Sequence, residues 1–394
     1  MLTKAQSTYL NFVRAGAALA VLAGHAAQLF LSDSRFKNSH IENAGVFVFF
    51  IISGFLISFS VLHHMNNKAY TFKTFFIDRF CRIYCAFIPA LLFVKILDSF
   101  TLSLPVDSST RLSELAWIPG MQDHEDWLTF CGNLLMLQDF PLFQVLRKMG
   151  LEESPFFIDT FGSGAPFWTI SVEWWIYMLF GFTTIFLMRD KKKLNIVNSC
   201  LLSFFLIVPF YYAIGGVGNC LTLLWIVGML FAYLFKYLTR ILKQRAFLKT
   251  IINTKMILIF VFLFFTLLMF GRLMGIYIDL GKLALHEFQF GLFLALAIFT
   301  GLLYFGFYQS FPTWIDKPIC FLADYSYSLY LIHFPILTYL YLRFPDNDSN
   351  RYFFYLAVLV CNAIAILFWF LFERHYRYLA RWLKAITLAI HKSQ

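Results

Sequence analysis

Arg14 and His25 are the residues best suited to chemistry, and they stand eleven positions apart in one apolar stretch, 9–31. At about 100° per residue, this offset places His25 within roughly 20° of the direction of Arg14 on a helix, about 16 Å further along the axis. Ionisable groups inside a membrane span are costly and face a cavity or a partner. The pair is therefore either functional or a set of polar contacts that holds helices together.

Glu173 lies in the segment PFWTISVEWWIY (166–177), which opens a later span. If that span runs from outside to inside, Glu173 lies about 9 Å below the outer surface, the same depth as His25. A carboxylate beside an imidazole can fix the tautomer of a histidine general base or share in proton transfer. The alternative is a structural polar pair between two helices.

Arg79 and Arg82 lie in FFIDRFCRIY (75–84), at the start of another span. Because they are three positions apart, both guanidinium groups project from one face of the helix. Paired arginines suit phosphate oxygens through forked, charge-assisted hydrogen bonds, although they could equally be ordinary cytoplasmic anchors. With Arg14 at a similar level, they fit a phosphate-bearing head whose long thin arm reaches towards His25.

Two further segments carry polar or small residues inside apolar helices. DYSYSLYLIHFP (324–335) places Tyr327 and His333 in an unusually polar span, where they would contact a substrate or make structural hydrogen bonds. FFIISGFLIS (49–58) contains Ser53 and Gly54, and small residues at such positions predict close helix packing.

The composition identifies an integral membrane protein. Of the 394 residues, 60% are hydrophobic and only 14% are charged, and the mean hydropathy is +0.69. Globular chains are about 25% charged, so the soluble class is excluded. The net charge of +10 is explained by basic cytoplasmic loops better than by nucleic-acid binding. The seven cysteines show no zinc or haem spacing, and no His/carboxylate cluster has ligand spacing, so we expect no metal.

Long apolar segments predict an all-α fold, a polytopic bundle of ten transmembrane helices. The predicted spans are 9–31, 43–62, 83–104, 167–187, 195–213, 219–238, 256–276, 284–306, 325–344 and 353–373. Lys and Arg are concentrated in alternate loops and at both ends, which predicts that both termini are cytoplasmic. We expect a transmembrane domain over 1–376 with an acidic outer segment at 105–166, followed by a short basic cytoplasmic tail at 377–394.

Taken together, these segments resemble the acyltransferase-3 family of bacterial integral-membrane O-acyltransferases. The matching elements occur in family order and cover essentially the whole chain: Arg14-x10-His25, FFIISGF (49–55), Arg79-x-x-Arg82, FCGNLLMLQ (130–138), PFWTISVEWWIY (166–177) and YSYSLYLIHFPI (325–336). Two details depart from the family pattern. Tyr84 and Cys85 follow Arg82 where a proline is common, and the last span ends in ERHYR (373–377) without the usual nearby proline.

The resemblance implies transfer of an acyl group, usually acetyl, from cytoplasmic acyl-coenzyme A to a hydroxyl at the outer face. His25 matches the essential histidine of the family, Arg14 its motif partner, and Glu173 its acidic residue. We expect Arg79, Arg82 and Arg14 to hold the coenzyme A phosphates. His25 would act as general base or transient acyl carrier, oriented by Glu173, with Tyr327 and His333 near the substrate.

The resemblance also sets expectations for partners and location. The donor would be acetyl-CoA, and the acceptor a glycan or lipid-linked sugar, such as O-antigen, capsule or exopolysaccharide. The protein would lie in the bacterial inner membrane, in contact with its lipids, and would need no metal. The alternative is a multi-pass transporter or flippase for a polysaccharide precursor, in which buried Arg, His and Glu side chains form substrate or proton sites. The absence of inverted-repeat symmetry in the sequence argues against that alternative.

Overall fold

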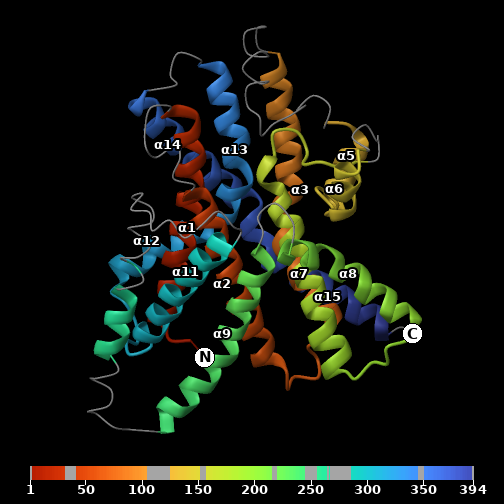
Figure 1. The fold of residues 1–394 in the computed structure, drawn as a ribbon, viewed down its shortest axis with the longest axis vertical. Coiled ribbons are helices and arrows are strands. Elements are labelled where there is room, and N and C mark those ends of the chain that lie inside the picture. The colour runs from red at the N-terminus through yellow and green to blue at the C-terminus, as the bar shows by residue number, and fades with distance from the viewer. Residues whose placement is uncertain are drawn as a thin grey trace. The chain divides into compact units, whose positions relative to one another are not determined.

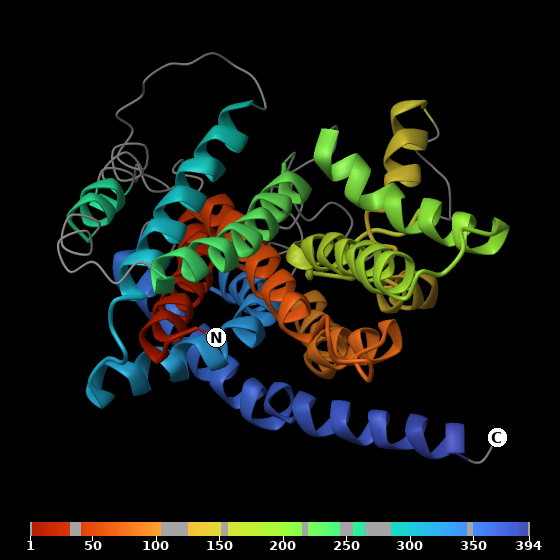
Figure 2. The same ribbon diagram turned by 90° about the horizontal axis from the view of Figure 1, so that it is seen from below.

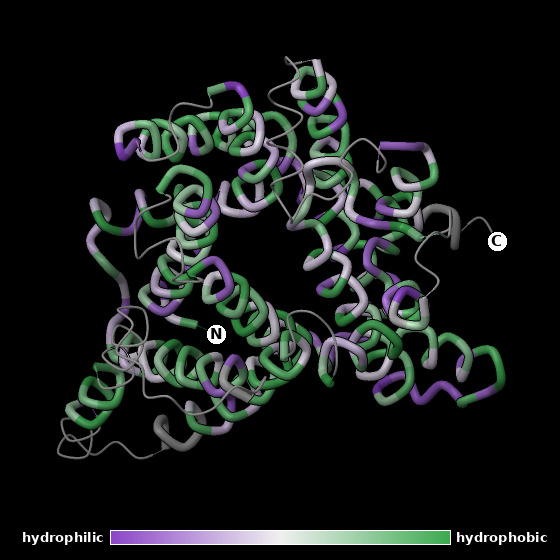
Figure 3. The backbone as a smooth tube through the Cα atoms, turned by 45° about the horizontal axis from the view of Figure 1, so that its top comes forward, coloured by the Kyte–Doolittle hydropathy of each residue, from purple (hydrophilic) through white to green (hydrophobic). Residues whose placement is uncertain are grey.

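The computed structural model describes residues 2–31, 41–103, 125–150, 157–214, 220–244, 255–263, 266, 285–344 and 350–392. Within these ranges every regular element is a helix (Figure 1), as the sequence predicts. Hydrophobic residues run along the length of the helices (Figure 3), in keeping with a chain built for lipid rather than water.

Eight helical segments in the described ranges are long and apolar enough to cross a membrane: Lys4–Phe30, Ile41–His64, Phe72–Leu102, Ala165–Arg189, Ile196–Ile214, Leu221–Thr239, Glu287–Phe305 and Arg351–Thr387. Each overlaps a span predicted from the sequence. The predicted span 256–276 lies largely outside the described residues, which show a helix at 255–263. The predicted span 325–344 is helix α13 (Ser326–Arg343), whose 18 residues include too many Ser, Tyr and His side chains to count among the eight.

The chain divides into two compact units. Unit 1 comprises Met1–Gly24, Asn38–Asn66 and Tyr212–Ser326, and unit 2 comprises His25–Lys37, Asn67–Tyr211 and Tyr327–Gln394. Helix α1 (Lys4–Phe30) supplies Arg14 to unit 1 and His25 to unit 2, whereas nearly all of α13 belongs to unit 2. Helix α8 (Ile196–Ile214) belongs to unit 2 except for its last three residues, Tyr212–Ile214, and the remaining helices each belong to one unit.

Unit 1 is organised around the crossing of α2 (Ile41–His64) and α9 (Leu221–Gln244). A Cβ atom added at Gly54 would collide with the backbone of Trp225, and one added at Gly228 would collide with the backbone of Ile51. The indole Nε1 of Trp225 donates to the hydroxyl of Ser53 at 3.2 Å. The close packing predicted for Ser53 and Gly54 is thus confirmed. Helix α11 (Leu285–Phe305) packs against both helices.

Unit 2 is organised around α3 (Phe72–Leu102), which begins at a capping box formed by Thr71 and Thr74. Helix α7 (Trp168–Gly181) packs on α3 and continues as a π-helical stretch, Phe182–Arg189. On the chain's return, α14 (Arg351–Leu371) ends in a 3₁₀ turn, Glu373–His375. Helix α15 (Tyr376–Lys392) then packs along α3 as the last described element of the chain (Figure 2). The described part of the predicted basic tail, 377–392, is therefore helical.

The described part of the predicted outer segment is folded onto α3 and α7. It contains two short helices, α5 (Trp127–Leu134) and α6 (Pro141–Lys148). The backbone carbonyl of Met136 accepts hydrogen bonds from the hydroxyl of Ser171 at 2.7 Å and from the indole of Trp175 at 2.8 Å. These contacts fix the first half of α7, which carries Glu173.

Candidate functional site

His25 and His333 form a hydrogen-bonded pair in unit 2. Nδ1 of His25 lies 3.0 Å from Nε2 of His333, and the two rings are stacked with centroids 5.2 Å apart. The ring of Phe334 meets His25 edge-on at 5.1 Å. His333 is 1% exposed, whereas His25 is half-buried. His25 is therefore the more accessible member of the pair.

Backbone carbonyl groups fix the tautomer of His333. Its Nδ1 atom lies 2.8 Å from the carbonyl oxygen of Tyr330 and 3.1 Å from that of Leu329. A carbonyl oxygen only accepts, so Nδ1 of His333 must donate, and Nε2 of the neutral ring must accept. The proton shared by the two histidines is thus assigned, from these partners, to Nδ1 of His25.

This assignment leaves Nε2 of His25 with an unprotonated lone pair. The ring is oriented through Nδ1, while Nε2 is available to take a proton from a hydroxyl group. In the Ser-His-Asp triads of hydrolases a carboxylate fixes the tautomer of the histidine base in the same way. Here a second imidazole, anchored on backbone carbonyls, does so.

Glu173 lies elsewhere in unit 2. It accepts a hydrogen bond from the hydroxyl of Tyr177, one turn further along α7, and interacts electrostatically with Tyr327 and Tyr330. The structure shows His333 in the place that the sequence analysis gave to Glu173, as the hydrogen-bond partner of His25. Among the described residues, the hydrogen-bond partner of His25 is thus an imidazole, where the sequence analysis expected the carboxylate of Glu173.

Tyr330 links the helix of His333 to the start of α7. Its hydroxyl lies 2.5 Å from that of Thr169 and 3.3 Å from the carbonyl oxygen of Pro166. Thr169 also donates to the same carbonyl at 3.0 Å. Because all three residues are buried or nearly so, this small network fixes the height of His333 against α7.

Arg79 projects from α3 over two aromatic rings. Its guanidinium carbon lies 5.9 Å from the ring centre of Phe75 and 6.0 Å from that of Tyr177. Its buried Nε atom has no hydrogen-bond partner among the described residues. A buried donor without a partner is unfavourable, so this guanidinium is suited to take an anionic ligand. Tyr177 contacts both Arg79 and Glu173.

Arg82 is held by a buried carboxylate. Its Nη1 atom lies 2.6 Å from Oε1 of Glu373, which is 1% exposed. The other carboxylate oxygen accepts from the backbone N–H and the hydroxyl of Ser328, at 3.0 and 2.6 Å. The guanidinium also faces the rings of Tyr327 and Tyr376, with its carbon 5.4 and 4.9 Å from the ring centres. This cluster joins α3, α13 and the turn between α14 and α15.

Arg14 is positioned in unit 1 by helix α12 (Thr313–Asp324). Its Nη2 atom donates to the carbonyl oxygen of Ala323 at 2.9 Å. Nearer the start of α1, Thr8 donates to Asp316 at 2.5 Å and Lys4 forms an ion pair with Asp316 at 3.1 Å. These hydrogen bonds hold the pKa of Asp316 below its ordinary value. The polar seam fixes the rotation of α1, and with it the direction of Arg14.

Gly24, directly before His25, allows α1 to approach α2. A Cβ atom at this position would lie 2.6 Å from the carboxylate oxygen Oε2 of Glu42 and 2.9 Å from its backbone nitrogen. No side chain fits there without displacing Glu42. Close contact therefore holds α1 in place one residue before the candidate base.

Sequence reasoning named seven of these residues (Arg14, His25, Arg79, Arg82, Glu173, Tyr327 and His333) but missed Glu373 and Thr169. The available signal for Glu373 was a carboxylate beside the end of an apolar span, where a buried acid requires a partner. Thr169 gave no signal, because a threonine inside an apolar helix ordinarily bonds to its own backbone.

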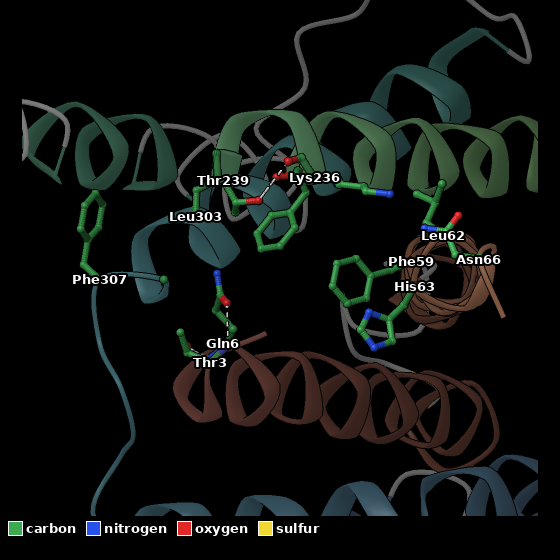
Figure 4. Close-up of a pocket in the computed structure, with 12 residues that line it drawn as sticks. Thr3, Gln6, Phe59, Leu62, His63, Asn66, Lys236, Thr239, Leu303 and Phe307 are labelled. Carbon is green, nitrogen blue, oxygen red and sulfur yellow. Dashed lines mark hydrogen bonds between the residues drawn. The ribbon is translucent and has the colours of Figure 1, made fainter. Parts of the chain in front are cut away.

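An open pocket of about 460 Å³ lies in unit 1, at the ends of α2, α9 and α11 (Figure 4). Its lining is mixed: Phe and Leu side chains alternate with six polar residues, Thr3, Gln6, His63, Asn66, Lys236 and Thr239. None of the site residues predicted from the sequence lines it.

Comparison with known proteins identifies the family. Residues 7–384 match the acyltransferase-3 family, whose matching region is described as an acyltransferase domain. Neither the curated proteins nor the solved structures provide a match. The match covers nearly the whole chain, including every residue of the candidate site. The chain belongs to the acyltransferase-3 family and is a multi-pass membrane acyltransferase.

Proposed function

We propose that this acyltransferase moves an acetyl group from cytoplasmic acetyl-CoA to a hydroxyl of a glycan or lipid-linked sugar, in the bacterial inner membrane. The observation that carries the proposal is the hydrogen bond between His25 and His333, which leaves Nε2 of His25 unprotonated. A neutral imidazole with one oriented lone pair suits proton abstraction from an alcohol. The family supplies the acyl-transfer class of the reaction.

In the proposed reaction, Nε2 of His25 accepts the proton of the acceptor hydroxyl. The hydroxyl oxygen then forms a bond to the thioester carbonyl carbon, and collapse of the tetrahedral adduct breaks the carbon–sulfur bond. The departing thiolate takes the proton back from Nε2, so the products are an O-acetyl ester and free coenzyme A. No charge remains on the enzyme at the end of the cycle.

Arg79, Arg82 and Arg14 have different proposed roles in binding the donor. Arg79, with its buried Nε lacking a hydrogen-bond partner among the described residues, is suited to coenzyme A phosphate oxygens. Arg82 already bonds to Glu373, so we assign it a supporting role in the shape of the same region, with a secondary contribution to anion binding. Arg14, whose guanidinium is held by the carbonyl oxygen of Ala323 in unit 1, is a further candidate for binding a donor phosphate. Tyr327 and His333 remain candidates for contact with the substrate. Glu173 remains the candidate acidic residue of the site.

The proposal is tested with the purified full-length protein in nanodiscs and acetyl-CoA that carries a radiolabelled acetyl group. Wild type should release free coenzyme A and transfer the label to a hydroxyl acceptor, presented as a crude lipid-linked glycan extract. His25→Ala should lose activity by about 10²- to 10⁴-fold, the usual contribution of a general base. His63→Ala, which removes an exposed histidine at the end of α2, should retain it.

Failure of wild type to consume acetyl-CoA, or full activity of His25→Ala, would contradict the proposal. A transporter would instead move the glycan across the bilayer without consuming the thioester. Mass spectrometry of surface glycans from a deletion strain and its parent then identifies the acceptor, because the transferred acetyl group adds a fixed mass at each modified site.

A further inference from the structure

Helix α15 follows a segment that is much longer than one membrane span. The apolar helical run Arg351–Thr387 has 37 residues, whereas about 20 suffice to cross a bilayer. The 21 residues of α14 are enough alone. The run then breaks at Phe372, whose φ of −121° and ψ of −65° depart from helical values, and the 3₁₀ turn redirects the chain. Helix α15 is therefore not needed to span the membrane.

One face of α15 is packed against α3. Ala380 forms a buried cluster with Ile77 and Cys81, and Leu379 and Leu383 of α15 pack against this cluster. At the edge of this face, Nζ of Lys384 lies 2.6 Å from the carboxylate of Asp78. The helix is thus held on the protein and presents its other faces in a fixed direction.

A second face carries large apolar side chains that nothing in the described structure covers. Tyr378, Trp382 and Ile386 are spaced four residues apart and so form one stripe along the helix. They are 67%, 52% and 36% exposed. A tyrosine and a tryptophan on such a stripe are typical of the boundary between lipid headgroups and acyl chains.

The third face is basic. Arg377 and Arg381 are one turn apart, and Arg374 precedes them in the 3₁₀ turn; all three are exposed. They contact the ring of Phe370, the ring of Tyr376 and a backbone carbonyl, and no carboxylate within the described residues pairs with them. Three unneutralised guanidinium groups beside an aromatic stripe complement anionic headgroups above acyl chains.

We propose that α15 lies in the plane of the membrane interface and binds anionic phospholipid headgroups. In this arrangement Arg374, Arg377 and Arg381 contact headgroup phosphates, and Tyr378, Trp382 and Ile386 enter the acyl boundary. The proposal is independent of the transfer reaction. It does bring the membrane surface near the candidate site, because Tyr376 at the start of α15 lies under the guanidinium of Arg82.

The apolar contact is tested by fluorescence quenching in nanodiscs made with lipids brominated on their acyl chains. The chain has nine tryptophans, so the signal of Trp382 is taken as the difference between wild type and Trp382→Phe. We expect this difference signal to be quenched. An unquenched signal would overturn the proposal, as would particles of twice the expected protein mass in which Trp382 is shielded, because α15 would then contact a second copy of the chain.

The headgroup contact is tested with spin-labelled phosphatidylglycerol and phosphatidylcholine in the same particles. Wild type should retain phosphatidylglycerol preferentially, and Arg374→Gln/Arg377→Gln/Arg381→Gln should weaken this preference, by roughly five-fold for each arginine close to an anionic surface. The matched control is Lys191→Gln/Lys192→Gln/Lys193→Gln, which removes three exposed charges from the turn after the π-helical stretch. An equal loss in the control would show that net charge alone is responsible and would overturn the proposal.

Discussion

Nδ1 of His25 donates to Nε2 of His333, which in turn donates through its own Nδ1 to the carbonyl groups of Tyr330 and Leu329. The carbonyl oxygens can only accept, so Nδ1 of His333 must donate to them. Nε2 of His333 is then the acceptor, and Nδ1 of His25 is the donor of the bond between the two rings. The backbone carbonyl groups of Tyr330 and Leu329 therefore determine, through His333, that Nε2 is the unprotonated nitrogen of His25.

His333→Leu should lower acyl transfer by about 10- to 100-fold, taking as a guide the cost of removing groups that orient histidines at metal sites. His333→Gln should restore part of this loss, because its amide oxygen can accept from Nδ1 of His25. Initial rates at saturating acetyl-CoA measure both. Equal activity of the leucine and glutamine variants would contradict the hydrogen-bonding role and indicate that only the shape of the side chain matters.

Arg82→Gln should destabilise the protein by about 3 to 5 kcal/mol, because it leaves the buried carboxylate of Glu373 without its cation. The double variant Arg82→Gln/Glu373→Gln should recover much of this free energy of unfolding. Titration with a denaturing detergent measures it. Lys384→Gln is the control: its ion pair with Asp78 is half-exposed, so its loss should cost about 0 to 1 kcal/mol. A double variant no more stable than Arg82→Gln would disprove the buried-charge explanation.

Gly24→Ala should destabilise the protein by about 1 to 3 kcal/mol, because the new methyl group overlaps Glu42. Gly16→Ala lies in the same helix and meets nothing within 4 Å. That variant should be stabilising by about 0.5 to 1 kcal/mol, since alanine favours a helix over glycine. The two melting temperatures should move in opposite directions; parallel shifts would mean that α1 and α2 are not in close contact at Gly24.

Asp139, in the turn between α5 and α6, should make the outer segment sensitive to pH. Burial and the nearby Asp159 raise the pKa of Asp139 to about 7. The folded state then binds a proton that the unfolded state has lost, so this contribution is complete below about pH 4 and disappears as the pH rises through 7. Hydrogen exchange of residues 127–148, corrected for its intrinsic pH dependence, should show a loss of stability on the order of 1 kcal/mol between pH 5.5 and 8.5.

Asp139→Asn should remove most of this pH dependence, because asparagine is always neutral and tolerates the φ of 52° at this position. Asp126→Asn is the contrasting control. Hydrogen bonds from Thr129 hold the pKa of Asp126 below its ordinary value, despite some burial, so its loss should weaken the segment equally at both pH values. A pH profile that Asp139→Asn leaves unchanged would rule Asp139 out as its source.

The sequence was sufficient to predict the helices and the family because both depend on local patterns. Long apolar stretches must be helical in lipid, and the motif around Arg14 and His25 has a fixed spacing. The partner of His25 could not be predicted in the same way. Depth along a helix axis matched His25 with Glu173, but contact also depends on the rotation and neighbours of each helix, which a depth estimate does not contain.

Tertiary packing also explains why the different surroundings of Arg79 and Arg82 could not be predicted. The spacing of Arg79 and Arg82 placed both on one face of α3, and they have different surroundings there. Arg79 lies over Phe75 and Tyr177, whereas Arg82 meets a carboxylate supplied by Glu373, nearly three hundred residues later in the chain. A contact between such distant segments is set by tertiary packing and leaves no local pattern.

The pair formed by His25 and His333 has rings and backbone carbonyl groups as its contacts, with no carboxylate among the described residues that touch it. A positive charge formed on His25 would therefore rest in a largely apolar site without a counter-ion, which is costly. For the proposed transfer this favours a short residence time of the proton. Its arrival from the alcohol and its departure to the leaving thiolate should overlap in time, so that the imidazolium is never a stable resting species.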